Sequence, residues 1–215
     1  MDNQIELRTL EIKDLGAIKE IINEVWDFAS LIQSDKVLDA TLALYFNSVI
    51  MNATFAEVAL FAGELVGVIF GSIEGAKPKF LHMLENPSAI TMTLMQASDD
   101  ERRGICEYFG KQSAVYDELL ELQNETYDGC LDFIILSERV QGKGVGKALW
   151  NSLTTYFKEH DVSKLYVFTD TDCNYGFYDH LGFTRRAEKE VVYNFDDFEY
   201  TPVNFLYDYR IDDED

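Results

Sequence analysis

Residues 130–157 combine an apolar run, a turn that contains three glycines and a stretch of helical period. The apolar run has the length of a buried strand, and Leu149, Leu153 and Phe157 recur at helical spacing after the turn. A strand that passes through glycines into a helix presents unpaired backbone N–H groups to an anion. We therefore predict an anion site at this turn, shaped for a pyrophosphate.

The composition of the turn supports a specific anionic ligand. Gly142, Gly144 and Gly146 lack the side chains that would hold a phosphate away from the backbone. Lys143 and Lys147 lie between and beside them, in a chain whose formal net charge is -21. A local pair of lysines in so acidic a chain indicates attraction of one particular anion.

Charge and hydropathy exclude several classes of function. The chain has 39 acidic and 18 basic residues, which argues against binding to nucleic acid. No apolar run approaches the roughly 20 residues that span a membrane, and the first residues lack the basic leader and apolar region of a signal peptide. Cys106, Cys130 and Cys173 are odd in number and far apart, which argues against a disulfide scaffold or a zinc site. We expect a cytoplasmic protein.

The order of apolar patterns predicts one domain over residues 1–215, with a mixed sheet flanked by helices. Asp14 is expected to cap a helix over 15–28, and a second helix is expected over 38–50. Residues 54–62 and 65–73 resemble a hairpin that turns at Gly63 and Glu64. Residues 74–127 contain two further helical patterns, at 91–96 and 99–124, so we expect a helical insertion packed on the same domain.

In the C-terminal part of the chain, strand and helix patterns follow one another again. We expect a strand over 164–169, a short helix over 173–181 that Gly182 terminates, and extended segments over 190–195 and 203–211. Residues 212–215 form an acidic tail that is expected to fray. The last extended segment is rich in aromatic residues (Phe205, Tyr207, Tyr209), and either a homodimer edge or core packing would explain them.

Three phosphate-binding motifs can be compared with the turn. The Walker loop, G-x-x-x-x-G-K-[ST], requires glycine at the position of Gln141 and a hydroxyl at the position of Ala148. The dinucleotide fingerprint, G-x-G-x-x-G, requires its last glycine one position after Gly146. The pattern Q/R-x-x-G-x-G/A is filled completely by Gln141, Gly144 and Gly146.

The filled pattern resembles motif A of the GNAT N-acetyltransferase superfamily, whose members transfer an acyl group from acyl-CoA to an amine. A second match follows: Asn174 lies after a strand and a polar turn, and Tyr178-x-x-x-Gly182-Phe183 ends a helix. The resemblance is firm over residues 130–185, looser over the first helix and hairpin, and absent over 74–127. Glu138 is a departure, since many members have proline three residues before the glutamine.

This resemblance implies a mixed, mostly antiparallel central sheet flanked by helices, with the helical insertion between the third and fourth strands. It also implies that acetyl-CoA is the donor. Its pyrophosphate would bind the backbone N–H groups of seven residues (Gln141, Gly142, Lys143, Gly144, Val145, Gly146, Lys147). The backbone of Ile134 to Leu136 would lie along the pantetheine, and Asn174 would contact the cofactor, although Asn174 could equally cap a helix. Tyr178 would return a proton to the departing thiolate, although a core tyrosine would fit the same pattern.

The acceptor side is less determined. Asp132 and Glu74 are both candidates for the general base, and either could be ordinary surface charge. Cys173 lies near Asn174, but direct transfer needs no acyl-cysteine. No spacing typical of metal ligands occurs. We expect direct attack by a primary amine of a small molecule or peptide; a polyamine, an aminoglycoside and a lysine side chain stay open. The alternatives are a non-catalytic acyl-CoA sensor of the same fold and a nucleotide-binding protein.

Overall fold

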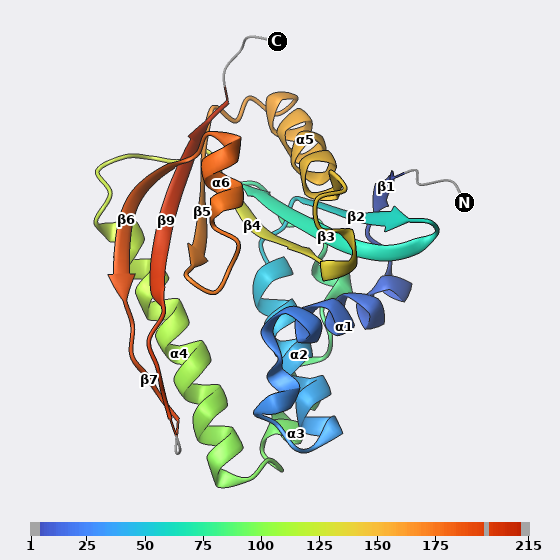
Figure 1. The fold of residues 1–215 in the computed structure, drawn as a ribbon, viewed down its shortest axis with the longest axis vertical. Helices are drawn as coiled ribbons and strands as arrows, with labels where there is room; N and C mark the ends of the chain where they lie inside the picture. Colours follow the sequence, from blue (N-terminus) through green and yellow to red (C-terminus); the bar gives the residue numbers. More distant parts are fainter. Residues whose placement is uncertain (1–4, 196–197, 212–215) are drawn as a thin grey trace.

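The computed structural model describes residues 5–195 and 198–211, so the acidic tail at 212–215 lies outside the described residues (Figure 1). One seven-stranded sheet has the order β1-β2-β3-β4-β5-β9-β6, and only β4 and β5 are parallel neighbours. Its strands are β1 (Ile5–Thr9), β2 (Phe55–Phe61), β3 (Glu64–Ile73), β4 (Gly129–Leu136), β5 (Lys164–Asp170), β6 (Thr184–Glu190) and β9 (Val203–Arg210). Strands β7 (Tyr193–Asn194) and β8 (Glu199–Tyr200) pair separately.

Helices cover both faces of this sheet (Figure 1). One face carries α1 (Leu15–Trp26), α2 (Asp35–Ile50) and α4 (Asp99–Glu121), with α3 (Pro87–Leu94) packed on α2. The other face carries α5 (Val145–Lys158) and α6 (Gly176–Leu181). Short 3-10 turns link them: η1 (Ile12–Asp14), η2 (Phe28–Ser30), η3 (Leu81–Met83) and η4 (Glu138–Val140). The prediction of a mixed, mostly antiparallel sheet with a helical insertion between the third and fourth strands is confirmed.

Strand alternation divides the core into two layers. In β3, Val68 and Phe70 face α1 and α2, whereas Ile69 faces α5. Leu153 and Phe157 of α5 are fully buried against that second layer. Burial of such a side chain contributes roughly 1.5–3 kcal/mol, so α5 is held firmly beneath the turn that precedes it.

Two local predictions are corrected. Asp14 does not cap α1 with its side chain, because its carboxylate accepts two 2.7 Å hydrogen bonds from Arg8 and one from the Glu11 N–H. The hairpin turns at Ala62 and Gly63, whose φ values of 55° and 84° are those of a type I′ turn. The expected position, one residue later, is therefore wrong.

The last strand is not a sheet edge, because β9 lies between β5 and β6. Tyr207 is fully buried there, and Phe205 is 4% exposed. Of the two alternatives, core packing therefore explains the aromatic residues, because β9 offers no edge at which a second copy of the sheet could pair. The short helix α6 also begins later than predicted, at Gly176.

The one parallel pair of strands is hydrogen-bonded at one end only. Gly129 pairs with Leu165 and Cys130 with Tyr166, and no further register is present between β4 and β5 among the described residues. Gly129 lies where the two strands meet, and a Cβ atom there would be 2.9 Å from the Ser72 carbonyl oxygen and 3.2 Å from Val162. Glycine is needed at this position because neighbouring backbone leaves no room for a side chain.

Gly129→Ala is expected to lower the free energy of unfolding by about 1–3 kcal/mol, because overpacking must displace backbone. Urea denaturation of the purified variant measures this change. Gly110→Ala is the matched control: Gly110 lies inside α4 with open space around it, so alanine should raise stability by about 0.5–1 kcal/mol. Equal stability of Gly129→Ala and the natural chain would contradict the close packing at this junction.

Candidate functional site

The separation of β4 from β5 leaves one edge of β4 unpaired. On its other edge, β4 stays in register with β3 as far as Leu136, which pairs with Gly67. The edge toward β5 loses its partner after Cys130. Backbone groups along the part of β4 that contains Ile134 and Leu136 can therefore pair with an extended ligand that lies between the strands.

The glycine turn follows directly and begins α5. Gly142 and Gly144 have φ values of 73° and 81°, a region that side chains with a Cβ rarely adopt. Gly146 serves another purpose, since a Cβ atom there would lie 3.1 Å from Leu136 and 3.3 Å from Phe177. Two glycines thus shape the loop, and the third lets the start of α5 approach the end of β4.

Backbone amides at the turn divide into two groups. The N–H groups of Gln141 and Lys143 donate to Glu138 and Val140, so two of the seven expected donors are already used. Gly142, Gly144, Val145, Gly146 and Lys147 have no acceptor for their N–H groups among the described residues. Those five amides, at the positive end of α5, suit an anion such as the CoA pyrophosphate.

The entry to the turn is held by residues that the sequence patterns did not reveal. Ser137 follows β4 directly and is buried; its hydroxyl donates to the Glu24 carboxylate at 2.9 Å. The same Glu24 oxygen accepts the Glu138 N–H at 3.0 Å. Proline at 138 has no N–H to donate, so the departure at this position allows α1 to anchor the loop. Arg139 is turned away toward Glu64, at 2.9 Å.

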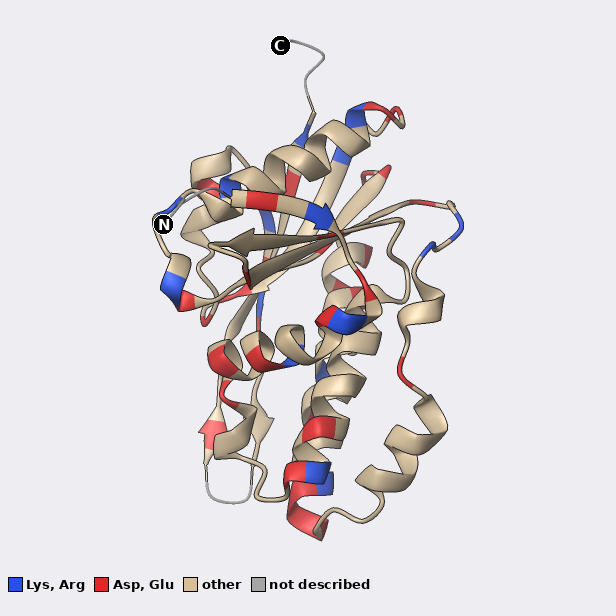
Figure 2. Cartoon of the chain, turned by 90° about the vertical axis from the view of Figure 1, so that its right-hand side faces the viewer, with Lys and Arg blue, Asp and Glu red and all other residues tan. Residues whose placement is uncertain are grey.

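Positive charge near the turn comes from two lysines. Both Lys143 and Lys147 are exposed, and the Lys143 ammonium lies 4.7 Å from the centre of the Phe61 ring. Along the ribbon in Figure 2, the positions of Lys and Arg are scattered among those of Asp and Glu. The turn is therefore a local anion site, which does not suit a nucleic-acid backbone.

Tyr178 of α6 lies on the same face of the sheet as α5. Its ring contacts Phe183 and Tyr207 at centroid distances of 5.5 and 5.9 Å. Burial raises the pKa of its phenol far above the ordinary value, and the charges of Cys173 and Asp170 act in the same direction. No hydrogen-bond partner is present for the hydroxyl among the described residues. It is therefore a protonated donor without a protein acceptor in this part of the chain.

Asn174 and Cys173 precede α6, and they differ in whether their side chains can interact with a ligand. Asn174 is exposed, and no capping hydrogen bond from its side chain to α6 is present, since the helix cap is Tyr175. Its amide is therefore available to a ligand. Burial raises the pKa of the Cys173 thiol to about 12, so the thiol is protonated and a poor nucleophile at neutral pH.

Asp132 lies on the opposite face of the sheet from Tyr178. Its Oδ1 accepts a hydrogen bond from Ser72 at 2.8 Å, while Oδ2 is buried without a partner among the described residues. Burial raises the pKa of this carboxyl to about 7. The side chain thus combines an unsatisfied oxygen with a pKa suited to proton transfer. Glu74, the other candidate base, lies exposed beyond the end of β3.

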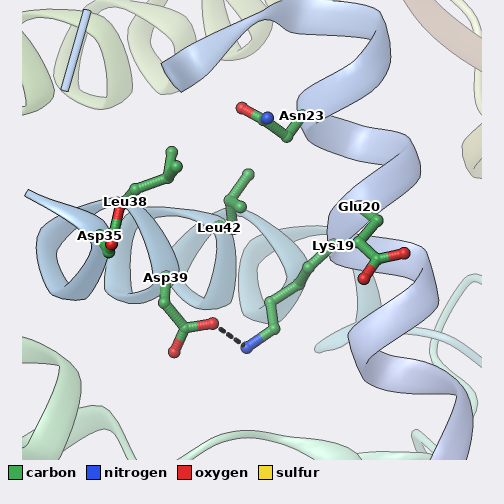
Figure 3. A pocket seen from close by; sticks show the side chains of 7 residues that line it. All are labelled: Lys19, Glu20, Asn23, Asp35, Leu38, Asp39 and Leu42. Atoms are coloured by element: carbon green, nitrogen blue, oxygen red, sulfur yellow. Dashed lines mark hydrogen bonds and ion pairs between the residues drawn. The ribbon is translucent and has the colours of Figure 1, made fainter. Parts of the chain in front are cut away.

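A separate pocket of about 230 Å³ lies between α1 and α2 (Figure 3). Lys19 crosses it and binds Asp39 at 2.7 Å, while Glu20 and Asp35 add negative charge to its wall. The pocket contains none of the residues of the glycine turn. Its acidic lining does not suit the anion that the turn would bind.

Other classes of site are not evident in the described part of the chain. No group of three or more His, Cys, Asp or Glu side chains is arranged to hold a metal ion within residues 5–195 and 198–211. None of the described helices has the length and apolarity needed to cross a membrane.

Comparisons with solved structures agree with this geometry. An N-acetyltransferase from Staphylococcus aureus Mu50 superposes with a TM-score of 0.53 at 14% identity, covering 96% of this chain and 98% of that one. A Salmonella typhimurium protein assigned as an acetyltransferase and solved with its cofactor acetyl-CoA gives 0.53 at 16%, covering 99% and 96%. The ribosomal-protein-S18-alanine N-acetyltransferase from Escherichia coli gives 0.52 at 13%, covering 99% and 97%. At such identities the likeness shows the fold.

No curated protein matches the chain. The sequence pattern of the acetyltransferase (GNAT) family does match it, over residues 18–183. That span includes the β4–β5 divergence, the glycine turn and Tyr178. The chain belongs to the GNAT acetyltransferase family.

Proposed function

We propose that this protein transfers an acetyl group from acetyl-CoA to a primary amine by direct attack. The observation that carries the proposal is the open edge of β4 leading into five unpaired amides at the start of α5. The edge suits an extended pantetheine arm, and the amides suit its pyrophosphate. Bound there, acetyl-CoA would supply the acetyl group as a thioester, with Gln141 to Lys147 and Asn174 as the binding residues.

Proton transfer is assigned to two residues on opposite faces of the sheet. Asp132, with Ser72, lies on the face of α1, α2 and α4, whereas Tyr178 lies on the face of α5 and α6. Asp132 would accept the proton of the attacking ammonium, and Tyr178 would donate one to the departing sulfur. In this proposal, acid and base would act from the two sides of the reacting carbonyl, and Cys173 would not be required.

A cytoplasmic location fits the same proposal. Cys106, Cys130 and Cys173 are all unpaired, which suits a reducing compartment. A non-catalytic sensor would also use the turn, and it differs in one measurement: acetyl-CoA would bind, yet no amine would release free thiol. A screen across amine classes with thiol as the readout therefore separates the two functions.

Gly144→Ala is expected to raise the dissociation constant of CoA about 5–30-fold, because a residue with a Cβ resists the left-handed backbone by about 1–2 kcal/mol and turns the amides away. Isothermal titration calorimetry with CoA measures the effect. Gly75→Ala, at φ 70° in an exposed turn, is the control and should leave CoA binding unchanged. Equal affinities for all three proteins would contradict phosphate binding by these amides.

Tyr178→Phe is expected to lower kcat about 100-fold with the amine found by the screen, because a general acid typically contributes 10²–10⁴-fold. The affinity for CoA should not change. Tyr209→Phe removes a phenol from the neighbouring cluster, where its ring lies 4.9 Å from Phe183, and should retain full turnover. Full turnover of Tyr178→Phe at every pH would exclude Tyr178 as the acid.

The pH dependence of kcat/KM should report Asp132, whose pKa is raised to about 7 by burial. A base must be ionised to accept a proton, so activity should rise about tenfold per pH unit below pH 7 and level off above it. Asp132→Asn should lower kcat at least 100-fold and remove this rise. Glu74→Gln, the matched control, should keep both kcat and the rise. If the rise with pH persists in Asp132→Asn, a residue other than Asp132 is the general base.

A further inference from the structure

The turn that leads from β4 into α5 is held by a carboxylate from a distant part of the chain. Glu24 lies in the last turn of α1, and one of its oxygens accepts two hydrogen bonds. The donors are the Ser137 hydroxyl at 2.9 Å and the Glu138 N–H at 3.0 Å, which follow β4 directly. Figure 1 shows the end of β4 close to α1. A single side chain thus fixes the backbone just before the glycines.

The position of Glu24 in α1 is not explained by the helix itself. An acidic side chain near a helix C-terminus faces the negative end of the helix dipole, which is unfavourable. The sequence of this last turn, Asn23 to Trp26, contains no basic residue that would offset the charge. The two hydrogen bonds to the turn after β4 account for a carboxylate here, since an ionised acceptor forms stronger hydrogen bonds than a neutral one.

Helix α1 is a firm support for this contact. Ile18 is fully buried against the sheet, and the Trp26 ring stacks on Phe133 of β4 at a centroid distance of 5.8 Å. Ser137 is also tied to the sheet, because its backbone N–H donates to the Val66 carbonyl of β3 at 2.8 Å. The last turn of α1 and the strands β3 and β4 therefore form one packed junction where the turn begins.

Arg139 extends the same hydrogen-bonded network. Its Nε donates to the Ser137 hydroxyl at 3.1 Å, and its Nη1 donates to Glu64, at the start of β3, at 2.9 Å. The Ser137 hydroxyl thus accepts from Arg139 while it donates to Glu24, so that hydrogen bonds run from the β2–β3 hairpin to α1. Removal of the Glu24 carboxylate would leave the buried Ser137 hydroxyl and the Glu138 N–H without their acceptor.

The backbone at position 138 can be restricted in another way. Ser137 has a φ of −60° and a ψ of 140°, the extended conformation that a residue before proline adopts. Glu138 is the first residue of the 3-10 turn η4, where the fixed φ of proline also fits. Proline would restrict this backbone through its ring, whereas this chain restricts it through the hydrogen bond from Glu138 to Glu24.

We infer that Glu24 is a positioning residue for the CoA pyrophosphate: it holds the turn after β4 in the conformation that presents the five unpaired amides at the start of α5. A turn that is already held in its binding conformation loses less entropy when the ligand binds, so the affinity is higher. Glu24 acts through Ser137 and Glu138 and does not need to touch the cofactor. This inference rests on the cofactor-binding half of the proposed function, to which it adds a residue from α1.

The test measures CoA affinity by isothermal titration calorimetry, without an acceptor. Glu24→Ala is expected to raise the dissociation constant of CoA about 3–10-fold, the range of one net hydrogen bond. Glu20→Ala removes the same charge from an exposed position one turn earlier in α1 and should leave the affinity unchanged. Glu138→Pro alone should bind CoA like the natural chain, and adding Glu24→Ala to it should change the dissociation constant less than about twofold.

A second variant and a stability measurement separate positioning from a purely structural role. Ser137→Ala removes one of the two donors to Glu24 and should also weaken CoA binding, which tests the same contact if Glu24→Ala does not fold. The melting temperature of each variant is recorded alongside the titration. A purely structural role would lower the melting temperature of Glu24→Ala and leave the CoA dissociation constant of the folded protein unchanged.

The outcomes distinguish this inference from the proposed acetyl transfer. Weaker CoA binding by Glu24→Ala that is restored by Glu138→Pro supports the inference even if no amine releases free thiol, in which case only the transfer fails. Unchanged CoA affinity in Glu24→Ala, or an equal loss in Glu20→Ala or in the proline background, would overturn the inference and leave the transfer intact. Absence of CoA binding by the natural chain would overturn both.

Discussion

Every part of the candidate site depends on the loss of hydrogen bonding between β4 and β5 after two residue pairs. A cause lies on the other edge of β4, where Phe70 pairs with Phe133 and Gly71 with Leu131, so that Asp132 is the extra residue of a β-bulge. A bulge bends its strand and increases the local twist. The same irregularity thus turns β4 away from β5 and places a carboxylate beside the opening.

The divergence connects two faces that otherwise have separate cores. On one face, Val167 and Tyr178 pack with α5, whose first amides would bind the pyrophosphate under the proposed function. On the other, Phe168 packs with α4, and Asp170 follows it. Under the proposed function, a thioester between the strands would be reached from both faces, so that donor and acceptor would not compete for one entrance. The alternation of β5 gives each face its own side chains.

Local patterns predicted the glycine turn and the elements around it, because these depend on consecutive residues. The positive φ of Gly142 and Gly144 and the terminating role of Gly182 follow from glycine itself, and the helix after the turn follows from its period. The sequence also indicated a helical insertion, although not its role. Such patterns cannot show hydrogen bonds between distant segments. One example is the Ser137 hydroxyl, which donates to Glu24 of α1. Another is Arg8, which donates to the Asp14 carboxylate that was expected to cap a helix.

The environment of Asp132 was beyond prediction for the same reason. The sequence offered Asp132 and Glu74 as equal candidates for the base, because neither pattern shows which carboxyl is buried. In the structure, Ser72 of the neighbouring strand donates to Oδ1 of Asp132, and Oδ2 is buried without a partner among the described residues. A buried polar group without a partner typically costs about 1–3 kcal/mol of stability, so packing alone does not account for a carboxyl at this position. The role in proton transfer that we propose for Asp132 accounts for it, because burial also raises the pKa of this carboxyl to about 7.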